Sequence, residues 1–334
     1  MHEDPILAED QLHSRLRNAY SLAVSTLTFL PLGLDTRAER YRVICDDGTA
    51  YLLKAKSGPL YEPGGLMPRY LRDRGIRAVV APLATKSGAL WTFLGEWNVM
   101  LYPFIEGDSS WSGMTAAQWH ALGATFRQIH NAPLPPEDFV SPRRETFDPS
   151  DSITWSRDFV AQQEGLTGGS VYEIALRNLW LVHRARIERL LNGMAELGSA
   201  LRTNCGPYVI CHADLHPANL LRTDDGQVFV IDWDDVMLAP RERDYIFIEQ
   251  QPGDRFGLQN SLAFSQGYGA IEVDWRALTY YRYERIAQDL VAFTQEVFFR
   301  DDLSQATKAD SVQFFNDMLV EGGSLDAAFA SVPP

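Results

Sequence analysis

Three polar residues follow two short apolar runs and have the types and spacing needed to transfer a phosphoryl group. Asp214 and Asn219 come after the run Val209–Cys211, and Asp232 comes directly after the run Val228–Ile231. The separation of Asp214 from Asn219 is that of a kinase catalytic loop, in which the aspartate accepts the proton of the attacking hydroxyl. An amide and a second carboxylate hold Mg²⁺ against the nucleotide phosphates. We therefore predict that Asp214 and Asn219 are catalytic and that Asn219 and Asp232 bind Mg²⁺.

Two other interpretations of this loop require more coincidence. If its polar residues only formed turns, four positions suited to one chemistry would have to coincide by accident, namely His212, Asp214, Asn219 and Asp232. A zinc site at His212, His216 and Asp214 would lack a third nitrogen or sulfur ligand at a usable spacing. Asn219 and Asp232 instead suit a hard ion that prefers oxygen ligands. We expect His212 to orient the loop by hydrogen bonding.

Two hairpins are expected to position these residues. The turn Asp224–Gly226 separates the two apolar runs, so a hairpin should bring the loop and Asp232 together. A second hairpin is predicted between Tyr41–Cys45 and Thr49–Lys56. Its second strand carries Lys54, and a strand lysine can reach the α- and β-phosphates if a helix carboxylate positions it.

The rest of the nucleotide site is predicted around Lys54. Glu62 is its candidate partner, although Pro63–Gly65 weakens the first turn of the helix expected at 60–75. The loop around Gly33 is expected to cover the phosphates with backbone amides, even though it holds a single glycine. The predicted contacts of the nucleotide base are Tyr102, Phe104 and Ile105.

The composition narrows the class of protein. The chain has 334 residues, of which 46% are hydrophobic and 22% charged, as in ordinary globular proteins. Its net charge of −14 makes nucleic acid a poor partner, because binding it depends on neutralising phosphates with Lys and Arg. A cationic small molecule is a better partner, since a negative field concentrates it. Three cysteines without paired spacing and the lack of an apolar run of membrane-spanning length predict a cytoplasmic protein with no membrane partner.

The composition of the chain changes near residue 107. Up to that point the segments are typical of an antiparallel sheet with one helix, and from Thr115 the apolar residues recur at helical spacing. We therefore predict an α+β fold of two lobes. Residues 1–107 would form a nucleotide-binding lobe, and residues 108–334 a larger helical lobe with the catalytic loop and acceptor site. The sequence leaves monomer and dimer open.

The catalytic segment resembles that of a known family. His212–Asn219 is similar to the catalytic loop, and Ile231–Asp234 to the metal-binding segment, of the aminoglycoside phosphotransferases, which are relatives of eukaryotic protein kinases. The resemblance covers nearly the whole chain. It implies a two-lobed protein-kinase-like fold with a small antiparallel-sheet lobe and a larger helical lobe. It also implies Mg²⁺, a nucleoside triphosphate (ATP or GTP) as donor, and an antibiotic hydroxyl as acceptor.

Two later segments are the most specific part of the resemblance. Ile231–Asp244 and Tyr280–Ile286 are similar to those of family members that phosphorylate spectinomycin, an aminocyclitol. The resemblance therefore favours spectinomycin among the aminoglycoside and aminocyclitol acceptors. Acidic side chains would bind its ammonium groups and aromatic ones its rings. The predicted acceptor contacts are Trp233, Asp234, Asp235, Tyr281, Glu284 and Asp289.

Two other functions stay open at this stage. A metabolic small-molecule kinase, acting on choline, homoserine, a methylthio-sugar or a glycated amine, would use the same catalytic residues. A catalytically silent nucleotide-binding module would not need them intact. A protein kinase is disfavoured, because the segment from Asp232 to Asp244 is too short for an activation loop followed by an Ala-Pro-Glu motif.

Overall fold

The protein is described by a computed structural model that covers residues 5–32, 37–110, 113–136, 138–248, 257–270 and 272–330, with the side chains of 257–259 excepted. The chain forms two compact units. The first comprises residues 1–143, 209–238 and 263–269, and the second comprises residues 144–208, 239–262 and 270–334. Each unit is therefore built from chain segments that are far apart in the sequence.

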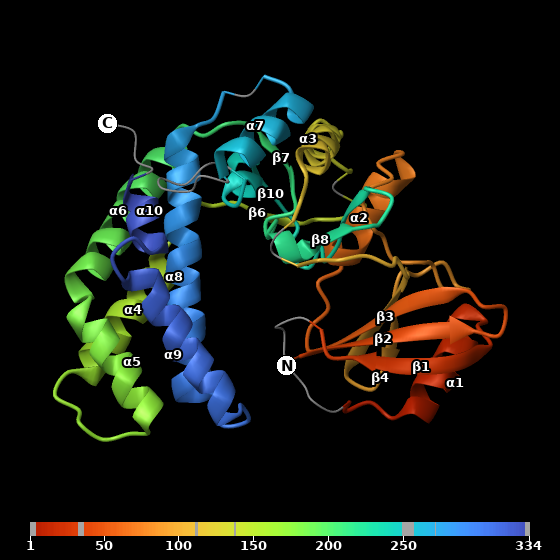
Figure 1. The fold of residues 1–334 in the computed structure, drawn as a ribbon, viewed down its shortest axis with the longest axis horizontal. Helices are drawn as coiled ribbons and strands as arrows, with labels where there is room; N and C mark the ends of the chain where they lie inside the picture. Colours follow the sequence, from red (N-terminus) through yellow and green to blue (C-terminus); the bar gives the residue numbers. More distant parts are fainter. Residues whose placement is uncertain are drawn as a thin grey trace. The chain divides into compact units, whose positions relative to one another are not determined.

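A five-stranded antiparallel sheet dominates the first unit (Figure 1). In the order in which they pair, its strands are β1 (Val24–Leu30), β2 (Ala38–Cys45), β3 (Ala50–Ser57), β5 (Trp97–Pro103) and β4 (Thr92–Leu94). Helix α1 (Glu9–Tyr20) contributes Leu12 and Leu16 to the core of this sheet, and neither side chain has exposed surface. Burying two such side chains stabilises the unit by about 1.5–3 kcal/mol each.

The alternation of strand side chains decides which residues face the site. Leu53 and Ala55 of β3 belong to the core shared with α1. Successive strand residues point to opposite faces, so Lys54 and Lys56 lie on the other face of the sheet. Arg40 of β2 is the cross-strand partner of Lys54 and shares that face.

The remaining elements of the first unit carry the predicted loop. A short antiparallel hairpin joins β8 (Leu220–Arg222) to β9 (Val228–Val230), and a one-turn helix, η1 (Pro217–Asn219), precedes it. Helices α2 (Pro63–Asp73) and α3 (Ala116–His130) belong to this unit, as does the end of α7 (Gly257–Tyr268). The short strands β6 (Arg143–Arg144), β7 (Tyr208–Cys211) and β10 (Met237–Pro240) span the points where the chain leaves one unit and enters the other.

The compact units do not divide at residue 107 as predicted. Asp108 pairs with Arg222 through two backbone hydrogen bonds of 2.8 and 2.9 Å, so the chain after residue 107 stays attached to the first unit. Val79 similarly bridges to Val230. The predicted catalytic loop therefore lies in the same unit as the antiparallel sheet, because segment 209–238 returns to pair with Val79 and Asp108 of that unit.

The second unit is helical (Figure 1). Its helices are α4 (Ser150–Gln163), α5 (Val171–Val182), α6 (Arg184–Thr203), η2 (Arg241–Tyr245), α8 (Trp275–Phe299), α9 (Gln305–Leu319) and α10 (Ser324–Ala330). The long α8 packs against α6, α9 and α10. The buried indole of Trp180 on α5 donates a 2.9 Å hydrogen bond to the hydroxyl of Thr294 on α8. None of the described helices is both long and apolar enough to cross a membrane.

Candidate functional site

The β8–β9 hairpin brings the two ends of the polar loop together. Leu220 pairs with Val230 and Arg222 with Val228, which confirms the predicted hairpin. Directly beyond the paired strands, the amide of Ile231 donates a 3.0 Å hydrogen bond to the carbonyl of Asn219. Asn219 and the residue after Ile231, Asp232, are therefore held beside each other by backbone pairing.

The side chain of Asn219 is oriented by Asp214. Its amide nitrogen donates to the backbone carbonyl of Asp214 at 2.8 Å and lies 3.4 Å from the carboxylate oxygen Oδ2. The same nitrogen lies 3.3 Å from Nε2 of His216. These contacts use the nitrogen of the amide, so within the described part of the chain its carbonyl oxygen is left for a cation.

The buried ring of His212 ties the loop to the strand that follows. Its Nε2 lies 2.9 Å from the carbonyl of Ile231, and its Nδ1 accepts a 3.3 Å hydrogen bond from the amide of Asp214. With both nitrogens engaged, His212 orients the loop and is poorly placed to bind zinc.

Two residues of this segment have a backbone conformation that L-residues rarely adopt. Ala213 has φ 71° and Asp232 has φ 60°, both in the left-handed region. Such residues cost about 1–3 kcal/mol each and cluster at functional sites, where the surrounding structure holds them. They lie on either side of the hairpin and aim the loop and the second carboxylate.

Asp232 is the centre of a cluster of ion pairs on the face of the sheet that lies opposite the core shared with α1. Lys54 Nζ lies 2.7 Å from its Oδ1, and Arg40 lies 3.4 Å from its Oδ2. Burial alone would raise the pKa of Asp232, but the attraction of Lys54 and Arg40 holds it well below its usual range. Burial likewise tends to lower the pKa of Lys54, but Asp232 and Asp234 raise it above its ordinary value. Asp232 and Lys54 are therefore both charged at neutral pH.

The predicted pair of Lys54 with Glu62 is wrong. Within the described part of the chain, Lys54 pairs with Asp232 at 2.7 Å and Asp234 at 2.8 Å, and Glu62 is exposed immediately before α2. The reason is local, because the helix begins at Pro63 and its first turn carries glycines. Arg40 was not predicted, because the expected strand began at Tyr41; its position opposite Lys54 in the hairpin is the signal that could have found it.

A cavity of about 340 Å³ adjoins this cluster, a volume typical of a small-ligand site. Lys54, Arg40 and Asp232 line one part of it, Glu106, Asp108 and Ser109 are further polar members of the lining, and most of the remaining residues are apolar. The apolar lining includes Leu30, Leu52, Val80, Tyr102, Phe104, Ile105 and Leu221. The predicted base contacts Tyr102, Phe104 and Ile105 thus line one cavity with Lys54, whereas Gly33 lies outside the described residues.

A second cavity, of about 360 Å³, contains two of the predicted acceptor residues. Asp234 and Asp235 line it, together with Lys56, Tyr61 and Arg143. Arg143 pairs with Asp235 at 3.2 Å and lies over the ring of Tyr61 at 4.3 Å. This cavity is polar, and its charges are of both signs.

The other predicted acceptor residues are buried or paired. Trp233 is 3% exposed, and its indole donates to the carbonyl of Val230 at 3.3 Å. In the second unit, Tyr281 has no exposed surface and Glu284 pairs with Arg243. Asp289 pairs with Arg285 at 3.1 Å.

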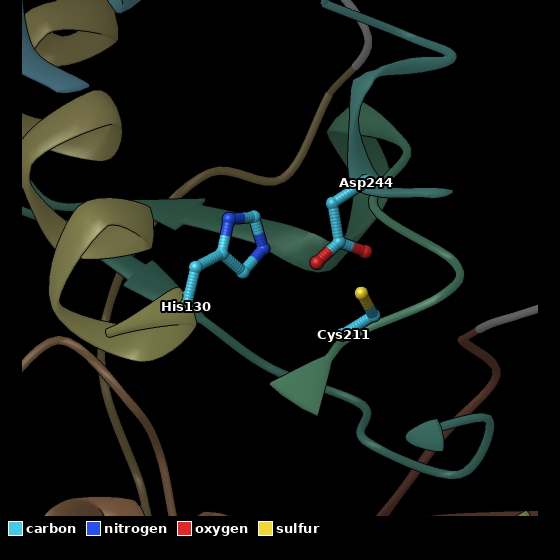
Figure 2. A group of neighbouring side chains, drawn as sticks. All are labelled: His130, Cys211 and Asp244. Atoms are coloured by element: carbon cyan, nitrogen blue, oxygen red, sulfur yellow. The ribbon is translucent and has the colours of Figure 1, made fainter. Parts of the chain in front are cut away.

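Cys211 fills a packed position and not a reactive one. Figure 2 shows it at the end of β7, with His130 on α3 in the same unit; Asp244, on η2, belongs to the second unit. Cys211 has no exposed surface, and Nδ1 of His130 lies 2.9 Å from the hydroxyl of Tyr268. The thiol is therefore a small core group, as expected for a buried free cysteine.

The chain matches a family model and several solved structures. The model described as the phosphotransferase enzyme family matches residues 28–280. Spectinomycin phosphotransferase APH(9)-Ia, solved with ADP and spectinomycin, is 29% identical over 98% of this chain and 99% of its own, with a TM-score of 0.86. No curated protein matches the chain.

Two more distant structures share the fold alone. An aminoglycoside phosphotransferase from Alicyclobacillus acidocaldarius is 16% identical over 99% of this chain and 95% of its own, with a TM-score of 0.63. An ethanolamine kinase from Plasmodium vivax is 12% identical over 98% of this chain and 84% of its own, with a TM-score of 0.56. Enzymes with different acceptors thus share this fold, so the acceptor must be argued from the site.

Proposed function

This chain belongs to the phosphotransferase enzyme family, and we propose that it transfers the γ-phosphoryl group of a nucleoside triphosphate to a hydroxyl of spectinomycin. It is a small-molecule kinase of the aminoglycoside phosphotransferase type, with an alcohol group as acceptor. Its fold is kinase-like, with a small antiparallel-sheet lobe and a mostly helical remainder, which confirms the predicted α+β class. The identity of the acceptor and the role of each side chain are proposals.

The hydrogen bond from Asn219 to Asp214, beside the Lys54–Asp232 pair, is the observation that carries the proposal. Asp214 would orient the acceptor hydroxyl and receive its proton late, because an aspartate with a pKa of about 3.9 is a weak base at neutral pH. Lys54 and Arg40 would bind the phosphates of the donor. Rigid positioning and charge stabilisation account for most of the catalysis in such a reaction.

The donor set fits a hard divalent cation. Asn219 offers a carbonyl oxygen and Asp232 an ionised carboxylate whose pKa is held low by two cationic neighbours despite its burial. We propose these two residues as the ligands of Mg²⁺. When bound, Mg²⁺ neutralises the charge that develops on the phosphate oxygens.

The cavity beside Lys54 is the proposed nucleotide site. Tyr102, Phe104 and Ile105 would enclose the base, and Lys54 and Arg40 lie where the phosphates would bind. Phe104 already donates its backbone N–H to Ala50 at 3.3 Å, so the amide of Ile105 is the better donor to a base. Solved relatives hold ADP, AMP or GDP, which supports ATP or GTP as the donor.

The exposed aspartates are the best-supported acceptor contacts. Asp235 has a side chain that is 57% exposed, so it can exchange Arg143 for an ammonium group of the acceptor. Asp289 is also partly exposed, beside Arg285. The burial of Trp233 and Tyr281 favours packing roles for both rings. Glu284 and Asp234 are held by cationic neighbours, and we do not retain them as acceptor contacts.

Substrate-dependent release of nucleoside diphosphate by the purified protein tests the proposal. Spectinomycin would be compared with other aminoglycosides and with choline, homoserine, a methylthio-sugar and a glycated amine, each with Mg²⁺ and ATP or GTP. We expect spectinomycin to give the highest kcat/KM. Turnover of a metabolic acceptor alone would identify a metabolic kinase. Nucleotide binding without turnover of any acceptor would identify a silent binding module.

A further inference from the structure

The first turn of α2 carries two glycines and no acidic side chain, whereas a strand lysine is usually positioned by a helix carboxylate. A Cβ atom added at Gly64 would lie 3.3 Å from the carbonyl oxygen of Trp233 and 3.4 Å from the Cα of Asp234. One at Gly65 would lie 3.4 Å from the side chain of Met100. At Gly64 the helix therefore packs with its backbone close to segment 233–234, and a longer side chain there would press on that segment, whereas one at Gly65 would meet Met100.

The segment against which this turn packs supplies a carboxylate of its own. Asp234 Oδ1 lies 2.8 Å from Lys54 Nζ, and Asp234 Oδ2 lies 2.8 Å from Lys56 Nζ. Each carboxylate oxygen of Asp234 thus forms an ion pair with one of the two lysines on this face of β3.

We propose that Asp234 is the positioning residue for Lys54 and takes the role of the missing helix carboxylate. The proposal rests on the proposed function, because it assumes that Lys54 binds nucleotide phosphates. Lys54 has two carboxylate partners, and one of them, Asp232, is a proposed metal ligand. Were Asp232 to serve a metal ion, Asp234 would remain as a carboxylate partner of the lysine. Lys56 fixes Asp234 from the opposite side, which limits its freedom to turn away.

This assignment differs from two other roles for Asp234. As an acceptor contact, Asp234 would act on spectinomycin independently of Lys54. As a metal ligand, it would act on Mg²⁺, again without need of the lysine. Only a residue that works through Lys54 loses its effect when the lysine is removed. A double-mutant cycle between the two residues therefore separates the three roles.

The cycle compares the wild type, Asp234→Asn, Lys54→Met and the double variant, with affinity for MgADP measured by calorimetry. We expect Asp234→Asn to weaken binding about tenfold in the wild-type background and less than about twofold in the Lys54→Met background. Losses that multiply in the double variant would overturn the proposal, as would an unchanged or tighter affinity in Asp234→Asn. Binding of MgADP needs no acceptor, so this test stands even if spectinomycin is not phosphorylated.

Three further variants provide a repeat of the cycle, a test of the rival carboxylate and a control. Asp234→Ser repeats the cycle with a smaller side chain, so that a folding failure of one substitution does not end it. Glu62→Gln tests the rival carboxylate, and a loss equal to that of Asp234→Asn would return the role to the helix. Asp73→Asn removes another acidic charge from α2, where exposed Asp73 pairs with Arg69, and should leave MgADP affinity unchanged. Thermal melting of each variant confirms that it is folded.

Discussion

Asp232 combines three properties that are seldom found in one residue. It has a left-handed backbone, two cationic neighbours and a side chain that is 29% exposed. The backbone conformation costs about 1–3 kcal/mol, and the surrounding ion pairs and hairpin hold it in place. This loss of stability is expected if the backbone conformation is needed to point the carboxylate at a cation and a phosphate. The ion cluster is thus both a structural support and the proposed catalytic centre.

The low pKa of Asp232 predicts how its charge contributes to stability as pH changes. The folded pKa lies below the value of about 3.9 expected in the unfolded chain, so the ionised carboxylate stabilises the fold above about pH 4. That contribution is lost as pH falls towards the folded pKa. We expect the free energy of unfolding of the wild type, relative to Asp232→Asn, to be constant from pH 7 to about pH 5 and to decrease below that. Urea unfolding of both proteins measures it. A difference that is equal at neutral and acidic pH would contradict this explanation.

Local spacing made some site residues predictable, and distance in the sequence hid others. The spacing of Asp214, Asn219 and Asp232 is local, and a hairpin visible in the sequence connects them. The partner of Lys54 could not be predicted in this way, because 178 residues separate it from Asp232 and nothing local links them. Glu62 was the nearest acid in the sequence, but proximity along the chain does not decide which carboxylate reaches a strand lysine.

At the scale of elements, α3 and α7 approach each other through a pair of glycines. A Cβ atom at Gly123 would overlap the backbone carbonyl of Phe264, and one at Gly267 would overlap the carbonyl of His120. The two helix backbones are therefore in direct contact at both positions. This crossing fixes the position of α3. The segment that follows α3 leads to Arg143, whose backbone N–H donates a hydrogen bond to the hydroxyl of Tyr61.

We expect Gly123→Ala to destabilise the protein by about 1–3 kcal/mol, because the added methyl must force the two helix backbones apart. Thermal and urea unfolding measure the loss. Gly168→Ala is the matched control, since a Cβ atom there meets no atom within 4 Å and its backbone is not in the left-handed region. Equal melting temperatures for the two variants would show that the crossing is not tight.

Element types were easier to predict than element limits and groupings. The two hairpins formed as expected, and the helical spacing expected from Thr115 corresponds to α3, whose first turn is capped by Thr115 and Gln118. The helix expected at 60–75 is shorter, Pro63–Asp73, because proline sets its start. The limits of the compact units could not be predicted from composition, since they depend on the return of segment 209–238 to pair with Val79 and Asp108.

At the scale of the whole molecule, the net charge of −14 bears on how substrates arrive. A negative field raises the association rate of a cation, and salt screens it. We expect kcat/KM for spectinomycin to fall several-fold between about 20 and 300 mM NaCl, mainly through KM. For MgATP, which is itself anionic, kcat/KM should stay level or rise. Parallel decreases for both substrates would indicate a general effect of salt on the enzyme and not steering.

The most direct measurement of the central claim follows transfer of labelled γ-phosphate from ATP to spectinomycin by the wild type and by Asp214→Ala. We predict that the wild type forms phosphorylated spectinomycin and that the variant is slower by about 10²–10⁴-fold, with its MgADP affinity unchanged. A variant that turns over at the rate of the wild type would contradict the assignment of Asp214 as the residue that receives the proton.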